Sequence, residues 1–532
     1  MIRLLSSLTA LVFALTASAQ AHVFSCGTSG ATGELLMPRL ERNLRAMGDH
    51  PALGRTVSFV PVHFFLVAES NGDDRILESD VYEQLCALNE DYAPMNIQFY
   101  IKNKNETLPQ GSYTANGLTY INNSVIFNDH TSSLTLMNNL YRDDNAINIW
   151  ILANATPAGG TIGQTLGYYS PQFDWVVMLD GEVNAESTTL SHELGHFFSL
   201  PHPHRGWDSK PFIPDPVPQW AISEGFTTPT PNPVPATAPD GIPTEKMSGS
   251  NCTTAGDKIC DTPPDYNGFG WPTCNFSAGA MDPDGVLIDP QEKLFMGYFG
   301  NCPVDDYFFS DMQQQIIMQD YASTERDYLR TGYSPNPTAL AAGCTNIAPA
   351  NNQTLSQFNE IFFQWSEVPG AERYLLEISR NSTYPASTTL NYVVSGTSKI
   401  VTDLEANRNY YFRVRPLTEY SSCVAPSANH FFKTGSVTAA AEPAFVKGWK
   451  LWPNPLVSGQ PLAIELNAAK AFSARIEILS LDGRQVVSPV SRSFKTGNNR
   501  VEIPAANLPS GVYWVKVNTA EGQFSKKIVV AK

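Results

Sequence analysis

Ser191-His192-Glu193-Leu194-Gly195-His196-Phe197-Phe198-Ser199-Leu200-Pro201-His202 is the stretch from which the rest of this chain can be interpreted. His192 and His196 are four residues apart, so on a helix both imidazoles project from one face and can reach one metal ion. Glu193 lies between them, where its carboxylate can contact a water on that metal. The pattern therefore predicts a helical metal site with an adjacent base.

A third imidazole can complete this site. His202 follows His196 by six residues, behind Pro201, which disfavours helix at the preceding residue, so a chain reversal can return the ring. Three neutral imidazoles leave one zinc position open, as a hydrolytic site requires. His204, expected on the surface, is a weaker alternative ligand. Ser199 stands where the long metzincin motif has glycine, so we expect a strained or differently shaped turn.

Composition limits the class of protein. The 532 residues are too many for one ordinary core and predict about two to four domains. A formal charge of −16 argues against nucleic acid as a partner and is compatible with calcium or cationic substrates. Residues 1–19 have the charge, apolar run and small-residue cleavage site of a secretory signal. No later segment is long enough to span a membrane, so export is predicted.

Eight cysteines in an exported chain indicate disulfides. Their spacing favours three local pairs, which are Cys252 with Cys260, Cys274 with Cys302, and Cys344 with Cys423. Cys26 and Cys86 remain. A thiolate is a strong zinc ligand, so Cys26 in a removable pro-segment, residues 20–55, can fill the open zinc position and keep the site silent until cleavage near Arg55. The alternative is a disulfide between Cys26 and Cys86.

Apolar runs around the histidine motif predict short strands at 57–68, 95–101, 146–152 and 175–179, and helices at 78–91 and 310–321. This order predicts an α/β layer with the histidine helix packed on the sheet. The glycine-rich segment 159–168 is either a turn or an edge strand that pairs with an extended peptide. Residues 208–244 are rich in proline and threonine, and are expected to be a long surface insertion.

Two motifs follow the histidines. The acidic stretch 251–265 offers hard oxygen ligands that suit calcium, namely Asp257, Asp261 and Thr262, with ordinary Asx-turns as the alternative. Farther on, Met296-Gly297-Tyr298 matches the methionine turn that metzincins place after a three-histidine motif. Met296 would form the apolar floor beneath the zinc, and Tyr298 would bring a phenol near the metal or the oxyanion.

Together these motifs resemble the pappalysin and cytophagalysin branch of the metzincin zinc peptidases. The matching segments are 88–92, 163–168, the three-histidine motif, 251–263 and 296–298. The resemblance implies an α+β catalytic domain at 56–331, built from a twisted mixed sheet and helices in two lobes. It implies zinc at His192, His196 and His202, Glu193 as general base, Met296 in the turn, Tyr298 nearby, and structural calcium.

The remaining chain predicts two all-β sandwich domains. Residues 342–436 look like a fibronectin type III module, with strands at 361–365, 374–378, 397–401 and 410–414 and with Trp365 and Tyr410 in its core. Residues 448–532 are similar to the C-terminal sorting domain of the type IX secretion system, with a hairpin signal at Asp482-Gly483. That resemblance implies the secretion machinery as a partner, followed by release or attachment at the outer cell surface. A plain binding sandwich is the alternative.

These features predict a secreted zinc endopeptidase that hydrolyses peptide bonds of extracellular proteins. Water is activated by the metal, and Glu193 takes its proton. The alternative is a cell-surface adhesin whose metzincin domain has lost catalysis. An adhesin has no need of Glu193 or of a third histidine, so the sequence favours the peptidase.

Overall fold

The computed structural model describes residues 24–28, 30–47, 56–102, 108–158, 164–271, 273–330, 332–336, 340, 342–436, 445–457, 460–480, 484–503, 505, 508–520 and 522–531. The expected signal at 1–19, Arg55 and the Asp482-Gly483 turn lie outside these residues. The chain divides into two compact units. The first contains Met1–Glu34, Thr156–Leu166 and Pro201–Met312, and the second contains Leu35–Ala155, Gly167–Leu200 and Gln313–Lys532.

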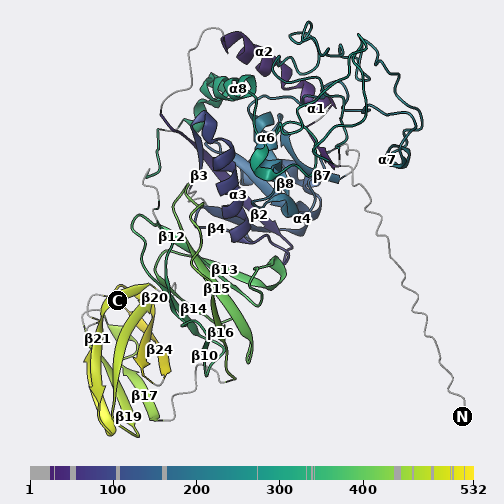
Figure 1. The fold of residues 1–532 in the computed structure, drawn as a ribbon. Coiled ribbons are helices and arrows are strands. Elements are labelled where there is room, and N and C mark those ends of the chain that lie inside the picture. Colours follow the sequence, from purple (N-terminus) through teal and green to yellow (C-terminus); the bar gives the residue numbers. More distant parts are fainter. Residues whose placement is uncertain are drawn as a thin grey trace, which may run out of the picture. The chain divides into compact units, whose positions relative to one another are not determined.

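A mixed sheet forms the centre of the second unit (Figure 1). Its strands follow the order β7-β8-β6-β2-β5-β4, and β3 also pairs with β2. Their bounds are Ser58–Ala68 (β2), Ile97–Ile101 (β3), Ser112–Ala115 (β4), Leu118–Asn122 (β5), Ile147–Leu152 (β6), Gln164–Ser170 (β7) and Trp175–Leu179 (β8). The central strand β2 is buried without interruption from Val60 to Ala68, because parallel partners and covering helices enclose both faces.

Several helices of the second unit pack beside the sheet, and one of them, α6, carries the histidine motif. The second unit contains α2 (Met37–Ala46), α3 (Glu78–Asp91), α4 (Ser124–Asn128), α5 (Leu134–Leu140), α6 (Thr189–Phe197), most of α8 (Asp311–Ala322), and the short 3-10 helices 93–95, 130–133, 180–182 and 324–329. Tyr92, directly after α3, donates from its hydroxyl to the carbonyl of Ser191 at 3.1 Å, and Ser191 Oγ donates to Asp91. These bonds fix α6 against α3. Among the described residues, no helix is long and apolar enough to cross a membrane.

The first unit has little regular structure. Its described elements are β1 (Phe24–Cys26), α1 (Gly30–Glu34), α7 (Gln219–Ser223) and a 3-10 turn at 304–306. An apolar cluster around Trp207 and Tyr266 also takes in Phe212, Val234 and Ala238, so the segment 208–244 contributes to a core and is only partly the surface insertion that we expected. The predicted disulfides Cys252–Cys260 and Cys274–Cys302 are both present in this unit.

Two β-sandwiches complete the chain, as predicted for the fold class. The first has the sheets β10-β16-β15-β12-β13 and β14-β11-β9, with bounds Asn346–Ala348 (β9), Gln353–Thr354 (β10), Ile361–Trp365 (β11), Arg373–Ser379 (β12), Thr389–Val394 (β13), Ser398–Val401 (β14), Asn409–Leu417 (β15) and His430–Lys433 (β16). A 3-10 turn lies at 386–388. Trp365 and Tyr410 lie in its core, which confirms their predicted positions.

The second sandwich has the sheets β17-β19-β22 and β18-β24-β23-β20-β21. Its strands are Val446–Trp452 (β17), Leu456–Val457 (β18), Leu462–Ala468 (β19), Phe472–Ser480 (β20), Gln485–Phe494 (β21), Gly497–Ile503 (β22), Gly511–Thr519 (β23) and Gly522–Ala531 (β24). One apolar core joins the two sheets, with Trp449, Ile464, Ile476, Val515 and Ile528 among its buried members. Residue alternation along β17 matches this arrangement, since Val446, Trp449 and Leu451 are buried.

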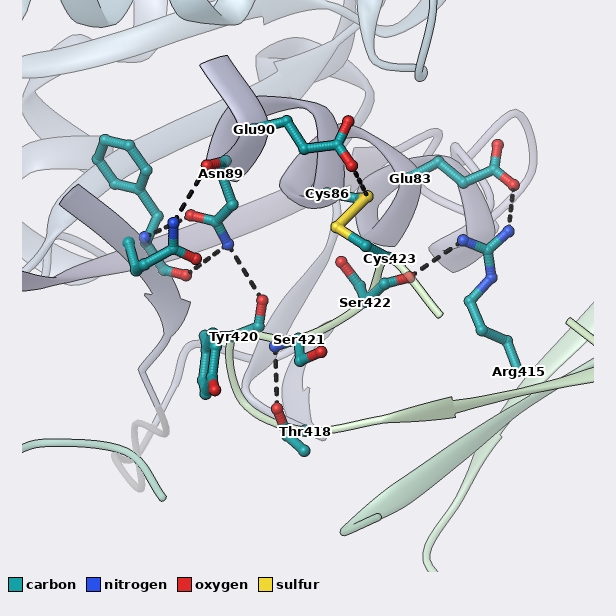
Figure 2. Close-up of a disulfide and its surroundings, with 12 residues drawn as sticks. Glu83, Cys86, Asn89, Glu90, Arg415, Thr418, Tyr420, Ser421, Ser422 and Cys423 are labelled. Atoms are coloured by element: carbon teal, nitrogen blue, oxygen red, sulfur yellow. Dashed lines mark hydrogen bonds and ion pairs between the residues drawn. A yellow bond between two sulfur atoms is a disulfide. The ribbon is translucent and has the colours of Figure 1, made fainter. Parts of the chain in front are cut away.

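The third disulfide corrects the sequence prediction. Cys423 pairs with Cys86 of α3 and not with Cys344 (Figure 2). The thiol of Cys344 is buried in the core of the first sandwich, where its Sγ donates to the carbonyl of Val414 at 3.1 Å. Cys423 lies in the loop after β15, which faces α3 instead of that core. The pairing also excludes the alternative disulfide between Cys26 and Cys86.

Polar contacts surround this disulfide (Figure 2). Asn89 Nδ2 donates to the carbonyl of Tyr420 at 3.0 Å. Arg415 places its guanidinium 2.7 Å from Glu83 and donates to the carbonyl of Ser422 at 3.1 Å. The loop 418–423 is therefore joined to α3 by a covalent bond and by hydrogen bonds on both sides of it.

Candidate metal centre

Helix α6 brings two imidazoles together. The Nε2 atoms of His192 and His196 lie 3.1 Å apart, and both residues are buried. His196 Nδ1 is 2.7 Å from the carbonyl of Leu200, so this nitrogen carries the proton and Nε2 keeps the lone pair that a metal requires. A buried pair of ε nitrogens with one tautomer fixed in this way fits a divalent zinc ion.

The turn after α6 explains how serine replaces the glycine of the motif. Ser199 adopts a left-handed conformation with φ of 72°, which costs serine about 1 kcal/mol relative to glycine. Its N–H donates to the carbonyl of His196 at 2.9 Å, and its Oγ accepts from Asn43 Nδ2 at 2.8 Å. The turn keeps the strained conformation, and the two hydrogen bonds offset its cost.

Glu193 is fully buried next to β7. A Cβ atom added at Gly167 would lie 3.2 Å from Glu193 Cγ and 3.1 Å from the carbonyl oxygen of Val177. Real side chains rarely tolerate such distances, so glycine at this position lets β7 run close to the carboxylate. Of the glycine-rich segment, 159–163 lie outside the described residues, and the rest forms β7 rather than a loop.

In the first unit, His202 has partners on both ring nitrogens. Its Nδ1 lies 3.1 Å from Asp208 Oδ1, and its Nε2 lies 3.1 Å from the hydroxyl of Tyr298. The carboxylate holds a proton on Nδ1 and thereby leaves the Nε2 lone pair for a hydroxyl or a metal. His204 stacks on His202 with ring centroids 4.5 Å apart. It is completely buried, so its expected surface position is wrong.

The turn predicted around methionine is present. Gly297 N donates to the carbonyl of Leu294 at 3.0 Å, and Met296 is completely buried. The hydroxyl of Tyr298 accepts from the backbone N–H of Cys26 at 2.8 Å. Because Asp208 holds the proton of His202 on Nδ1, the Nε2 atom accepts from the hydroxyl of Tyr298. The phenol of Tyr298 thus contacts His202, which the sequence predicts as the third zinc ligand.

Cys26 is the last residue of β1, and its thiol accepts from the N–H of Thr28 at 3.2 Å. Sulfur of a cysteine is a strong zinc ligand. The strand β1 is hydrogen-bonded to β7, whose first residues belong to the same unit. The edge strand expected to pair with an extended peptide therefore pairs with the segment that carries Cys26.

The predicted calcium ligands separate into two roles. Asp257 accepts from the N–H of Ile259 and the hydroxyl of Thr262, whereas Asp261 accepts from Ser310 Oγ and from the N–H of Met312, at the start of α8. The sequence did not indicate the carboxylate of Glu245, which is 4% exposed. Its Oε2 has no hydrogen-bond partner among the described residues.

Burial raises the pKa of both Glu245 and Asp257, and for Glu245 the charge of Asp257 adds to the effect. Two interacting buried acids, of which Glu245 has a carboxylate oxygen without a hydrogen-bond partner among the described residues, are suited to a hard cation. Glu245 was missed because it directly follows the segment 208–244, which has no metal-ligand pattern.

Comparisons with known proteins identify the C-terminal region. Residues 450–531 match the secretion system C-terminal sorting domain. This match confirms the predicted sorting domain, and the protein is secreted. An extracellular metalloprotease of Neurospora crassa is 25% identical over 223 residues, which span 38% of this chain and 73% of that protein.

Solved structures give weaker likenesses. A promirolysin variant of Tannerella forsythia is 17% identical, with a TM-score of 0.36, and the alignment covers 57% of this chain and 96% of that chain. A segment of chicken tenascin with two fibronectin type III domains is 13% identical, with a TM-score of 0.13, covering 35% and 98%. These TM-scores are too low to carry an argument about function.

Proposed function

We propose that this protein is a secreted zinc endopeptidase in which His192, His196 and His202 hold the metal. The observation that carries the proposal is the convergence of two buried ε nitrogens at 3.1 Å on α6, with Nδ1 of His196 fixed by Leu200. His202 follows Leu200 by two residues, and Asp208 holds its ring in one orientation, which supports His202 as the third ligand. The similarity to an extracellular metalloprotease supports the reaction class.

A bound zinc ion would supply Lewis acidity toward both water and the scissile carbonyl. The carboxylate of Glu193 accepts the proton of the attacking water and returns it to the leaving amine. Tyr298 would donate its phenolic proton toward the developing oxyanion when His202 Nε2 is engaged by the metal and no longer accepts that proton. The edge of β7 binds the substrate as an additional strand, which suits extended segments of proteins.

Metal analysis and a protease assay test this function. We expect one zinc per chain in the secreted protein, and cleavage of casein that 1,10-phenanthroline abolishes and added zinc restores. The control protein carries His430→Ala, a change in the first sandwich, and should keep both zinc and activity. Casein cleavage that persists after complete removal of zinc would contradict the proposal.

We also propose that Cys26 keeps the unprocessed chain silent. Cys26→Ala should raise the rate at which the uncut protein hydrolyses peptides, to a level below that of the processed protein, because no thiolate then competes for the metal while β1 still pairs with β7. Cys344→Ala is the control, since it removes the buried thiol of the first sandwich and should leave the uncut protein inactive. The measurement is the initial rate on a quenched peptide, with intact mass confirming that the chain is uncut. Equal inactivity of both variants would contradict the latency role.

Glu245 and Asp257, with Thr262 beside them, are the proposed calcium ligands. Calcium at about 100 times its dissociation constant should stabilise the protein by about 2.7 kcal/mol, seen as a higher midpoint of thermal unfolding. The double variant Glu245→Gln, Asp257→Asn should lose this response. Asp289→Asn, a change at an exposed acid of the same unit, should retain it. An unchanged response in the double variant would exclude this site.

A further inference from the structure

Helix α2 belongs to the segment that the sequence assigns to a removable pro-segment, yet it makes extensive contacts with the second unit. The guanidinium of Arg39 donates to the carbonyl of Phe197 at 2.7 Å, to Asp320 Oδ1 at 2.7 Å and to the hydroxyl of Tyr169 at 3.0 Å. Phe197 is the last residue of the histidine helix α6. Arg39 therefore satisfies a carbonyl at the end of α6 that has no partner within the helix.

A second side chain of α2 contacts the turn after α6. Asn43 Nδ2 donates to Ser199 Oγ at 2.8 Å and to Asp320 Oδ2 at 2.9 Å. Asn43 is 1% exposed, and Asp320 is completely buried. The serine that replaces the glycine of the motif thus has a dedicated partner, and this partner comes from the N-terminal segment.

Apolar contacts accompany the polar ones. Leu36 and Leu40 are completely buried and Met37 is nearly so, whereas Arg45 lies on the exposed side of the same helix. A segment that only blocks an active site has no need of a buried apolar face. Lasting interfaces are more apolar than transient ones, and the buried face of this helix shares that character.

We propose that Met37–Ala46 is a lasting part of the second unit. Its docking site consists of the carbonyl of Phe197, the hydroxyl of Ser199 and the carboxylate of Asp320. When the chain is cut within residues 48–55, α2 stays bound to this site and continues to hold the end of α6. Cys26 lies on the same fragment, so the site opens when β1 detaches from β7 while α2 remains in place. The inference goes beyond the proposed peptidase function, because the contacts involve no metal ligand and remain valid if the protein binds no zinc.

The test uses the full-length chain with Glu193→Gln, so that it does not cut itself, and with a specific protease site in place of residues 48–55. After cleavage, gel filtration and intact mass should show the N-terminal fragment eluting with the body of the protein. In the double variant Arg39→Ala, Asn43→Ala the fragment should dissociate at least about tenfold faster, because buried polar pairs act mainly on dissociation rates. Arg45→Ala is the matched control and should release the fragment at the parent rate.

Two results would overturn the proposal. One is loss of the fragment from the parent protein during gel filtration, and the other is equal release from the double variant and from Arg45→Ala. If the double variant does not fold, Arg39→Lys replaces it, because lysine keeps the charge but cannot reach Phe197, Asp320 and Tyr169 together. Zinc content is measured on the same samples, so failure of the metal site is distinguished from failure of the docking site.

Discussion

Glu193→Gln should lower kcat/KM for peptide hydrolysis by about 10²- to 10⁴-fold while the zinc content stays at one per chain. The amide has the shape of the carboxylate but cannot accept a proton from the attacking water. Glu193 is fully buried beside β7, so no other carboxylate from solvent can replace it in this position. Zinc is measured by mass spectrometry on the protein used for the kinetics.

Glu186→Gln provides the matched control for this experiment. Glu186 is exposed in the loop before α6 and carries the same charge, so its loss should leave kcat/KM unchanged. Undiminished hydrolysis by Glu193→Gln would show that another group is the base. If Glu193→Gln loses zinc together with activity, Glu193→Asp is measured instead, because aspartate keeps the carboxylate but has a shorter reach. Retained zinc with a reduced kcat in Glu193→Asp then supports Glu193 as the base.

Arg326→Met should destabilise the second unit by about 3–5 kcal/mol, because it leaves Asp174 without its cation and removes one of the arginines that neutralise the buried Asp320. Arg326 is 2% exposed. Its guanidinium donates to both oxygens of Asp174, at 2.7 and 2.8 Å, to Asp320 at 3.0 Å and to the carbonyl of Phe197. It also lies over the ring of Phe197, 3.6 Å from the centroid. Methionine keeps most of the chain length and removes the charge.

The same ion pair has a pH signature. Burial alone would raise the pKa of Asp174, but Arg326 outweighs it and holds that pKa at about 2. Because the pKa in the folded protein is depressed, this stabilisation is present above the ordinary aspartate pKa of about 3.9 and is lost as the pH falls toward 2. Arg326→Met should remove this acid-dependent part of the unfolding profile.

Arg330→Met is the control, since Arg330 lies at the surface, where it pairs with the exposed Asp327 and donates to the carbonyls of Tyr321 and Ser323. Loss of these surface contacts should cost about 1 kcal/mol or less, well below the effect of Arg326→Met. Calorimetry gives the unfolding midpoint of each variant and of the parent protein. If both variants unfold with the same midpoint as the parent, the buried network does not stabilise this unit.

Sequence periodicity predicted best those helices and strands whose buried residues coincide with the apolar positions of their own sequence. The helix at 78–91 and the strands at 361–365 and 175–179 have the predicted bounds, because one or both faces of each are apolar. The expected strand at 95–101 begins at Ile97, since a 3-10 turn occupies Ala93–Met95. The hairpin of β4 and β5 was missed, because its strands are short and β4 has no fully buried residue.

Contacts between distant segments could not be predicted from the sequence. The spacing of the histidines indicated His192 and His196 because four residues on a helix determine the distance between them. Asp208, Glu245 and Arg326 belong to no spacing pattern, and only folding brings each to its partner. The pairing of Cys86 with Cys423 spans 337 residues, so the preference for neighbouring cysteines selected the wrong partner for Cys423.

That long-range disulfide has a consequence for how damage to the chain would be detected. A host protease that nicks the polypeptide anywhere between Cys86 and Cys423 leaves two pieces that are still covalently linked. Nicked and intact molecules would migrate together in electrophoresis without a reducing agent and would separate only after reduction. Breakage inside this region would therefore go unnoticed on an ordinary non-reducing gel.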